Sequence, residues 1–132
     1  MDSLFSLEGK LALVTGGGSG LGASIATTLS NSGAKVALAA RRKEKLEETK
    51  KLIIEKGGKA ETYNLDVSDE GNIQSCLKSI KEDMGEIDIL INNAGTTTVG
   101  SIDGTSSEEW NSVINTNLRG PWLLAKEWVT DK

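Results

Sequence analysis

The sequence predicts an α/β fold in which a parallel sheet lies between two layers of helices, in the three-layer, doubly wound arrangement. Two observations carry this prediction. Short apolar runs alternate along the chain with longer segments of helical periodicity. A glycine-rich segment, Gly16–Gly22, joins the end of the first apolar run to the start of the first helical segment. Such alternation is typical of a parallel sheet whose crossovers are helices.

The first strand and the first helix flank the glycine-rich segment. Lys10–Val14 is an apolar run too short for a helix, and we expect it to be a buried strand. Apolar residues recur at helical spacing within Leu21–Asn31, and Gly33 follows as a helix stop. Lys35–Ala40 is a second apolar run, expected to be a second buried parallel strand.

The middle of the chain repeats the pattern. Glu44–Glu55 predicts a strongly charged helix, with Leu46, Ile53 and Ile54 available to face the sheet. A pair of glycines follows and is expected to end this helix. Lys59–Leu65 then predicts the third strand.

The last predicted elements are marked by capping residues. Ser68 is a candidate N-cap for a helix over Asp69–Met84. Ile87–Ile91 is a nearly continuous apolar run and predicts the fourth strand. Ser106 and Glu109 have capping-box spacing, so a long final helix is expected to start there.

These four strands, joined by right-handed crossovers, predict the sheet order 3-2-1-4 of a Rossmann-type fold. Strand four is then an edge strand with unpaired backbone groups. Ligands of such folds bind over the carboxyl ends of the strands, where the strand order reverses. We therefore expect a site between the ends of strands one and four.

Composition excludes several classes of function. A chain of 132 residues leaves room for one domain, and its net charge of −4 argues against a nucleic-acid partner. The single cysteine, Cys76, cannot form an internal disulfide, and the absence of histidine makes a metal site unexpected. No stretch is long enough to span a membrane, and Met1–Gly9 does not resemble a signal peptide, so a cytoplasmic location is expected.

The glycine-rich loop predicts a phosphate-binding site. A loop between a strand and a helix directs unpaired N–H groups, and the positive end of the helix dipole, at a ligand above it. Its spacing is Gly16-x-x-x-Gly20-x-Gly22, without the Gly-Lys-Ser/Thr of a Walker loop. A plain tight turn is the alternative.

The residues after strand two favour NADP over NAD as the cofactor. Folds that prefer NAD place an acid there to bind the ribose 2′-hydroxyl. Here Ala40 is followed by Arg41, Arg42 and Lys43, and no carboxylate occurs before Glu44. A guanidinium binds a 2′-phosphate with two hydrogen bonds. The alternative is that these cations are only the solvated start of a charged helix.

Four motifs together resemble the amino-terminal half of a classical short-chain dehydrogenase/reductase, of the 3-oxoacyl-carrier-protein reductase type. They are the glycine loop beginning at Thr15, Asp66-Val67, the Asn-Asn-Ala-Gly segment Asn92–Gly95, and Asn117–Gly120. The resemblance implies that residues 1–132 form an NAD(P)-binding domain and that the carboxyl-terminal half of the fold is absent. It covers nearly the whole chain.

The resemblance also implies roles for individual residues. Those expected to surround the pyrophosphate are Gly16, Ser19, Gly20, Leu21 and Gly22. Those expected along the ribose path are Asn93, Ala94 and Gly95. Asp66 would hydrogen-bond the adenine amino group, and Val67 would border the ring. Considered as an isolated residue, Asp66 is better explained as an ordinary turn acid at a strand end.

Asn117 matches the asparagine of the family's Asn-Ser-Tyr-Lys catalytic group. Pro121 has no N–H to donate to the Asn117 carbonyl, so a helix kink is expected. The only tyrosine, Tyr63, is followed four residues later by Val67 and not by lysine. The family's acid/base pair is therefore missing from this sequence.

Two functions follow as hypotheses, and a third hypothesis is that the chain is a non-functional truncation product. The first is the NADP-binding portion of an oxidoreductase whose full-length parent acts on a small carbonyl or alcohol substrate, with the 132-residue chain inactive alone. The second is a non-catalytic cofactor-binding or dimerisation module. The final helix carries Trp110, Trp122 and Trp128, and the resemblance implies that it contributes to a homo-oligomer interface.

Overall fold

The structure is a computed structural model that describes residues 5–18, 20–95 and 101–130. Its centre is a four-stranded parallel sheet in the order β3-β2-β1-β4. The strands are β1 (Leu11–Thr15), β2 (Lys35–Ala40), β3 (Ala60–Asn64) and β4 (Ile89–Ile91). The predicted fold class and strand order are confirmed, and β4 is an edge strand within the described residues. At three residues, β4 is shorter than predicted.

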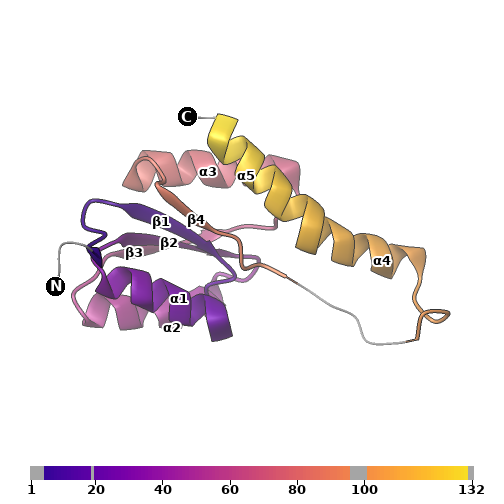
Figure 1. Cartoon of the computed structure of the whole chain (residues 1–132), viewed down its shortest axis with the longest axis horizontal. Coiled ribbons are helices and arrows are strands. Elements are labelled where there is room, and N and C mark those ends of the chain that lie inside the picture. The colour runs from indigo at the N-terminus through magenta and orange to yellow at the C-terminus, as the bar shows by residue number, and fades with distance from the viewer. Residues whose placement is uncertain (1–4, 19, 96–100, 131–132) are drawn as a thin grey trace.

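Helices cover both faces of the sheet (Figure 1). On one face lie α1 (Gly20–Asn31) and α2 (Glu44–Glu55), and on the other lie α3 (Glu70–Met84) and α5 (Gly120–Thr130). The helix α4 (Ser107–Ile114) precedes α5 and projects beyond the sheet (Figure 1). No residue of α4 is therefore buried by the described parts of the chain.

The core consists of two clusters, one on each face of the sheet. Leu11 and Leu13 of β1 pack in the cluster that also holds residues of α3 and α5. Val14, at the next position, packs in the cluster that holds Leu46 and Ile53 of α2. Alternate residues of a strand point to opposite faces, so a strand covered on both sides is apolar throughout. This explains the continuous apolar run in the sequence.

Two predicted details of the helices are wrong. Asp69, not Ser68, caps α3, because the Asp69 carboxylate accepts a hydrogen bond from the backbone N–H of Asn72 at 3.1 Å. The Ser68 hydroxyl instead donates to Asp66 at 2.6 Å. Ile54 was expected to face the sheet but is 50% exposed, since it lies beside the buried Ile53 on the outer side of α2. The predicted cap of α4 is confirmed: Ser106 Oγ accepts from the Glu109 N–H at 3.0 Å.

The irregularity predicted near Pro121 takes the form of a π-helical turn over Asn115–Arg119. This turn joins α4 to α5, and the N–H of Gly120 bonds the carbonyl of Asn115. Proline cannot donate in the helical ladder, and a π turn accommodates the changed hydrogen-bond pattern. The turn places Thr116, which is buried, beside the carboxyl end of the sheet.

The structure bears on three further expectations. Within the described residues, no helix is long and apolar enough to cross a bilayer. No three His, Cys, Asp or Glu side chains of that same part of the chain gather closely enough to hold a metal ion. Cys76 is buried in the core as predicted, and its burial raises the pKa of the thiol to about 12. It therefore stays protonated at neutral pH.

Candidate functional site

The glycine-rich loop packs so closely that two of its glycines have no room for a side chain. A Cβ on Gly22 would overlap the Gly16 carbonyl oxygen and would lie 2.6 Å from Asn93 Nδ2. A Cβ on Gly18 would lie 2.9 Å from both the Cβ and the carbonyl oxygen of Lys45. Gly16 also has a φ of +67°, a conformation that L-residues with side chains rarely adopt. The loop therefore packs tightly against its own backbone and against α2, and Gly16 and Gly18 line the cavity above it.

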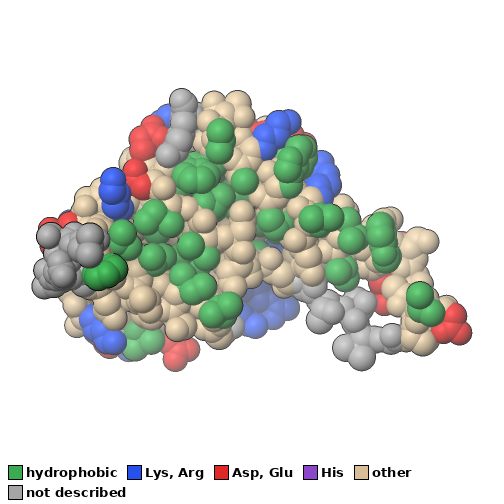
Figure 2. Space-filling view, viewed as in Figure 1, with side chains coloured by type: hydrophobic (Ala, Val, Ile, Leu, Met, Phe, Trp, Pro, Cys, Tyr) green, Lys and Arg blue, Asp and Glu red, His purple; other side chains and the backbone are tan. Residues whose placement is uncertain are grey.

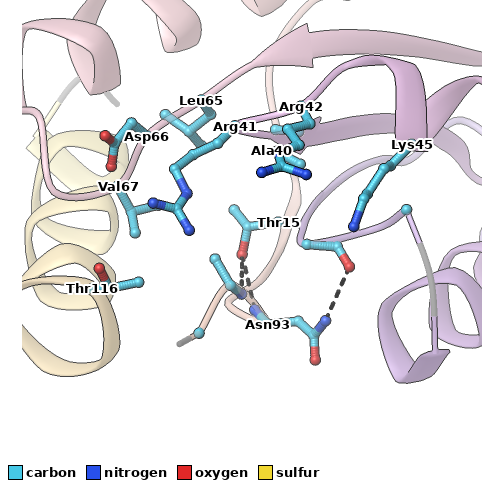
Figure 3. Close-up of a pocket in the computed structure, with 15 residues that line it drawn as sticks. Thr15, Ala40, Arg41, Arg42, Lys45, Leu65, Asp66, Val67, Asn93 and Thr116 are labelled. Carbon is cyan, nitrogen blue, oxygen red and sulfur yellow. Dashed lines mark hydrogen bonds between the residues drawn. The ribbon is translucent and has the colours of Figure 1, made fainter. Parts of the chain in front are cut away.

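A cavity of about 730 Å³ opens above this loop, at the carboxyl ends of the four strands (Figure 3). Eight of the predicted cofactor residues line it: Gly16, Arg41, Arg42, Asp66, Val67, Asn93, Ala94 and Gly95. This is the location that the predicted strand order implied. Sequence reasoning did not name Lys45 and Thr116, which also line it.

The remaining predicted residues lie beside the cavity or outside the described part of the chain. Gly20, Leu21 and Gly22 form the first turn of α1, and the Leu21 side chain is exposed. Ser19 lies outside the described residues. Asn117 is in the π turn, where its Oδ1 would lie 3.4 Å from a Cβ placed on Gly95. It therefore sits next to a residue that lines the cavity.

Thr15 joins the end of β1 to the segment after β4. Its Oγ1 accepts hydrogen bonds from the N–H groups of Asn93 and Ala94, at 2.9 and 3.0 Å. The same hydroxyl donates to the Ile91 carbonyl at 3.3 Å. Asn93 Nδ2 then donates to the Gly16 carbonyl at 3.2 Å (Figure 3). These bonds fix the glycine loop relative to the opposite wall of the cavity.

Asp66 is held in one orientation at the far side of the cavity. Its Oδ1 accepts from the N–H and the hydroxyl of Ser68, at 3.0 and 2.6 Å. Its own N–H donates to Asn72 Oδ1 at 2.6 Å. Burial opposes ionisation, but the Ser68 hydrogen bonds and the charge of Arg41 outweigh it, and the pKa of Asp66 lies below its ordinary value. The site therefore presents a fixed carboxylate.

Three cations line the wall between β2 and α2. Arg41 and Arg42 directly follow β2, and Lys45 is in the first turn of α2. Lys45 was missed because its helical position alone indicated only a charged, solvated face. Lys45 could have been predicted from its place in the first turn of α2, because that turn packs against the glycine loop.

Comparison with known proteins identifies the family of the chain. The sequence matches the short chain dehydrogenase family over residues 10–131. The chain belongs to this family.

Its relatives include oxidoreductases of known and unknown substrate. It is 39% identical over 121 residues to the 3-oxoacyl-[acyl-carrier-protein] reductase FabG of Escherichia coli, an alignment that covers 92% of this chain and 48% of the relative. It is 38% identical over 120 residues to an uncharacterized oxidoreductase of Thermotoga maritima, covering 91% and 47% respectively. The chain therefore spans about half the length of these relatives.

Solved structures of short-chain dehydrogenases superpose closely. A short-chain type dehydrogenase/reductase from Mycobacterium marinum gives a TM-score of 0.90 at 35% identity, covering 93% of this chain and 48% of that one. A metagenomic short-chain oxidoreductase in complex with NADP gives 0.87 at 37% identity, covering 91% and 55%.

Tyr63, the only tyrosine of the sequence, lies in the core. It is buried in the core cluster next to α3, and its hydroxyl donates to the Asp83 carboxylate at 3.1 Å. Burial and this hydrogen bond raise the pKa of Tyr63 above its ordinary value. Tyr63 is not among the described residues that line the cavity. Its role is to connect β3 to α3.

Proposed function

We propose that this chain is the NADP(H)-binding portion of a short-chain dehydrogenase/reductase that transfers hydride between NADP(H) and a carbonyl or alcohol carbon. One observation carries the proposal: a single cavity combines a bare glycine loop with Arg41 and Arg42 at the end of β2. The neighbour solved in complex with NADP has the same fold and supports this cofactor.

The residues present fit such a dinucleotide. The glycine loop and the amino end of α1 supply N–H groups and a positive dipole end for the pyrophosphate. A side chain on Gly18 or Gly22 would fill the loop. The oriented Asp66 carboxylate is proposed to accept from the adenine amino group, and Arg41 and Arg42 to bind the 2′-phosphate. When bound, NADPH supplies the hydride.

We propose that this chain binds the cofactor and that it lacks, when alone, the group that transfers the proton. The described residues that line it include no tyrosine. Asn117 is proposed as a member of the catalytic group because it lies next to Gly95 at the cavity wall. We propose that the chain alone has negligible turnover, because loss of a general acid/base typically costs about 10²–10⁴-fold in rate.

An exposed apolar face favours the second candidate function, a cofactor-binding or dimerisation module. Trp110, Leu118 and Trp122 are 59%, 66% and 58% exposed along α4 and the start of α5. Hydrophobic side chains are spread along this part of the surface (Figure 2). Patches of this kind mark association sites, and we propose that the chain forms homo-oligomers through this face.

Isothermal titration with NADP⁺ and NAD⁺ tests the cofactor assignment. The wild-type chain is expected to bind NADP⁺ more tightly, and Arg41→Ala to weaken NADP⁺ binding far more than NAD⁺ binding. Lys51→Ala, on the exposed side of α2, is the matched control. Equal affinities of the wild-type chain for the two dinucleotides would refute the NADP assignment.

A further inference from the structure

We propose that Lys45 is a specificity-determining residue whose ammonium group binds the ribose 2′-phosphate of NADP(H) together with Arg41 and Arg42. This inference rests on the proposed function and extends it to a residue that the sequence motifs do not mark. It is carried by the cation-lined wall of the cavity, by the surroundings of Lys45 and by its contact with the glycine loop.

The three cations share one wall of the cavity. Arg41, Arg42 and Lys45 extend from the connection between β2 and α2 into the space above Thr15 and Asn93 (Figure 3). Among the described residues, none of the three cations forms an ion pair with a carboxylate. Like charges held together in this way repel, and a bound dianion would relieve the repulsion.

The acids near Lys45 do not neutralise this wall. Glu47 lies in the first turn of α2, but its carboxylate accepts a hydrogen bond from Thr62 of β3 at 2.9 Å. Glu44 is exposed at the start of the helix and forms no ion pair with a described residue. Asp66 lies near Arg41, at the adenine side of the cavity. Asp66 therefore interacts electrostatically mainly with Arg41, and Lys45 remains available to bind another anion.

The backbone of Lys45 fixes where its side chain begins. The space that a Cβ on Gly18 would occupy is bounded by the Cβ and carbonyl of Lys45, each 2.9 Å away. The first turn of α2 therefore abuts the glycine loop. Lys45 and Arg41 line the same cavity as this loop, so a ribose phosphate between the loop and Arg41 would share that cavity with the Lys45 side chain. The backbone and Cβ of Lys45 are held in place by this packing, while its side chain is exposed. Its ammonium group is therefore suited to contact a phosphate as a point charge.

The test is the affinity of Lys45→Ala, Lys45→Gln and Lys45→Arg for NADP⁺ and NAD⁺ by isothermal titration. All three variants keep the Cβ and the carbonyl that contact Gly18, so the loop packing is preserved. We expect K45A and K45Q to weaken NADP⁺ binding about tenfold and to leave NAD⁺ binding unchanged, with K45R close to wild type. Lys51→Ala is the control on the same helix, and circular dichroism checks the fold.

The outcomes separate this inference from the proposed function. If the wild-type chain prefers NADP⁺ and K45A and K45Q keep that preference, the Lys45 assignment alone is refuted. Equal losses for NADP⁺ and NAD⁺ also refute it, because Lys45 would then act on the shared pyrophosphate or on the loop. A wild-type chain without a preference for NADP⁺ refutes both proposals.

Discussion

The Thr15 hydroxyl oxygen accepts the N–H of Asn93 at 2.9 Å, which joins the end of β1 to the segment that follows β4. Thr15 is 1% exposed, so these polar groups are shielded from water. Its second acceptor bond, from Ala94, and its donor bond to Ile91 complete the link. This buried hydroxyl therefore links two walls of the cavity.

Thr15→Val is expected to destabilise the fold by about 2–4 kcal/mol, because two N–H groups lose their acceptor in a buried position. Urea unfolding followed by circular dichroism measures the change in the free energy of unfolding. Thr15→Ser keeps the hydroxyl oxygen and is expected to lower the free energy of unfolding by less than Thr15→Val does. A valine variant as stable as the serine variant would contradict the proposed role of the hydroxyl.

Gly22→Ala is expected to abolish tight NADPH binding and to lower the melting temperature. The added Cβ would overlap the Gly16 carbonyl, a backbone group that cannot move without opening the loop. Gly71→Ala in α3 is the control, since its Cβ would meet only Asp69 Oδ1 at an ordinary 3.5 Å. NADPH fluorescence titration and thermal melts measure the two effects. Normal binding by G22A would show that the loop is not the pyrophosphate site.

Ser68→Ala is expected to raise the pKa of Asp66 toward its ordinary value, because the serine hydroxyl stabilises the ionised carboxylate. A lowered folded-state pKa contributes stability above the unfolded-state pKa, and this contribution is lost as the pH falls through the folded-state pKa. The stability difference between wild type and S68A should therefore shrink in acid, below the ordinary range of Asp. NMR titration of the Asp66 carboxyl gives the pKa directly, with Ser75→Ala as control. An unchanged pKa would contradict the assignment.

Tyr63→Phe is expected to cost about 1 kcal/mol of stability and to leave NADPH affinity unchanged. The loss comes from the hydrogen bond to Asp83, and the affinity is unaffected because Tyr63 lies in the core and not at the cavity. Denaturant unfolding and isothermal titration measure the two quantities on the same preparation. A large fall in affinity with normal stability would place Tyr63 in the site after all.

Trp122→Lys combined with Leu118→Lys is expected to reduce self-association of the chain. Both side chains are exposed where α4 meets α5, and burying such surface is the main driving force of association. Light scattering over a range of protein concentrations measures the mean mass. Leu52→Lys, at an exposed apolar position of α2, is the control. A wild-type chain that stays monomeric at high concentration would contradict the oligomer proposal.

The sequence was sufficient for the features that depend on neighbouring residues. Apolar runs between glycines and charges predicted the four strands, and right-handed crossovers predicted their order. The glycine spacing within Gly16–Gly22 predicted a phosphate site locally, whereas the role of Asp66 was predicted only from the family resemblance. Gly16 and Asp66 both line the cavity, and their roles toward a cofactor stay predictions. The cap at Ser106 was found because its spacing to Glu109 is also local.

Only the tertiary structure decided which distant groups meet. The Thr15 link to Asn93 and Ala94 spans separations of 78 and 79 residues, and no local pattern encodes it. Lys45 enters the cavity because α2 packs on Gly18, while Ile54 on the same helix faces solvent. The Ser68 hydroxyl bonds the Asp66 carboxylate instead of capping α3, and Asp69 provides the cap. Which of these two bonds Ser68 forms depends on the geometry of the loop. Periodicity and turn chemistry act over a few residues, whereas packing sets the distances between elements, and those distances determine the site.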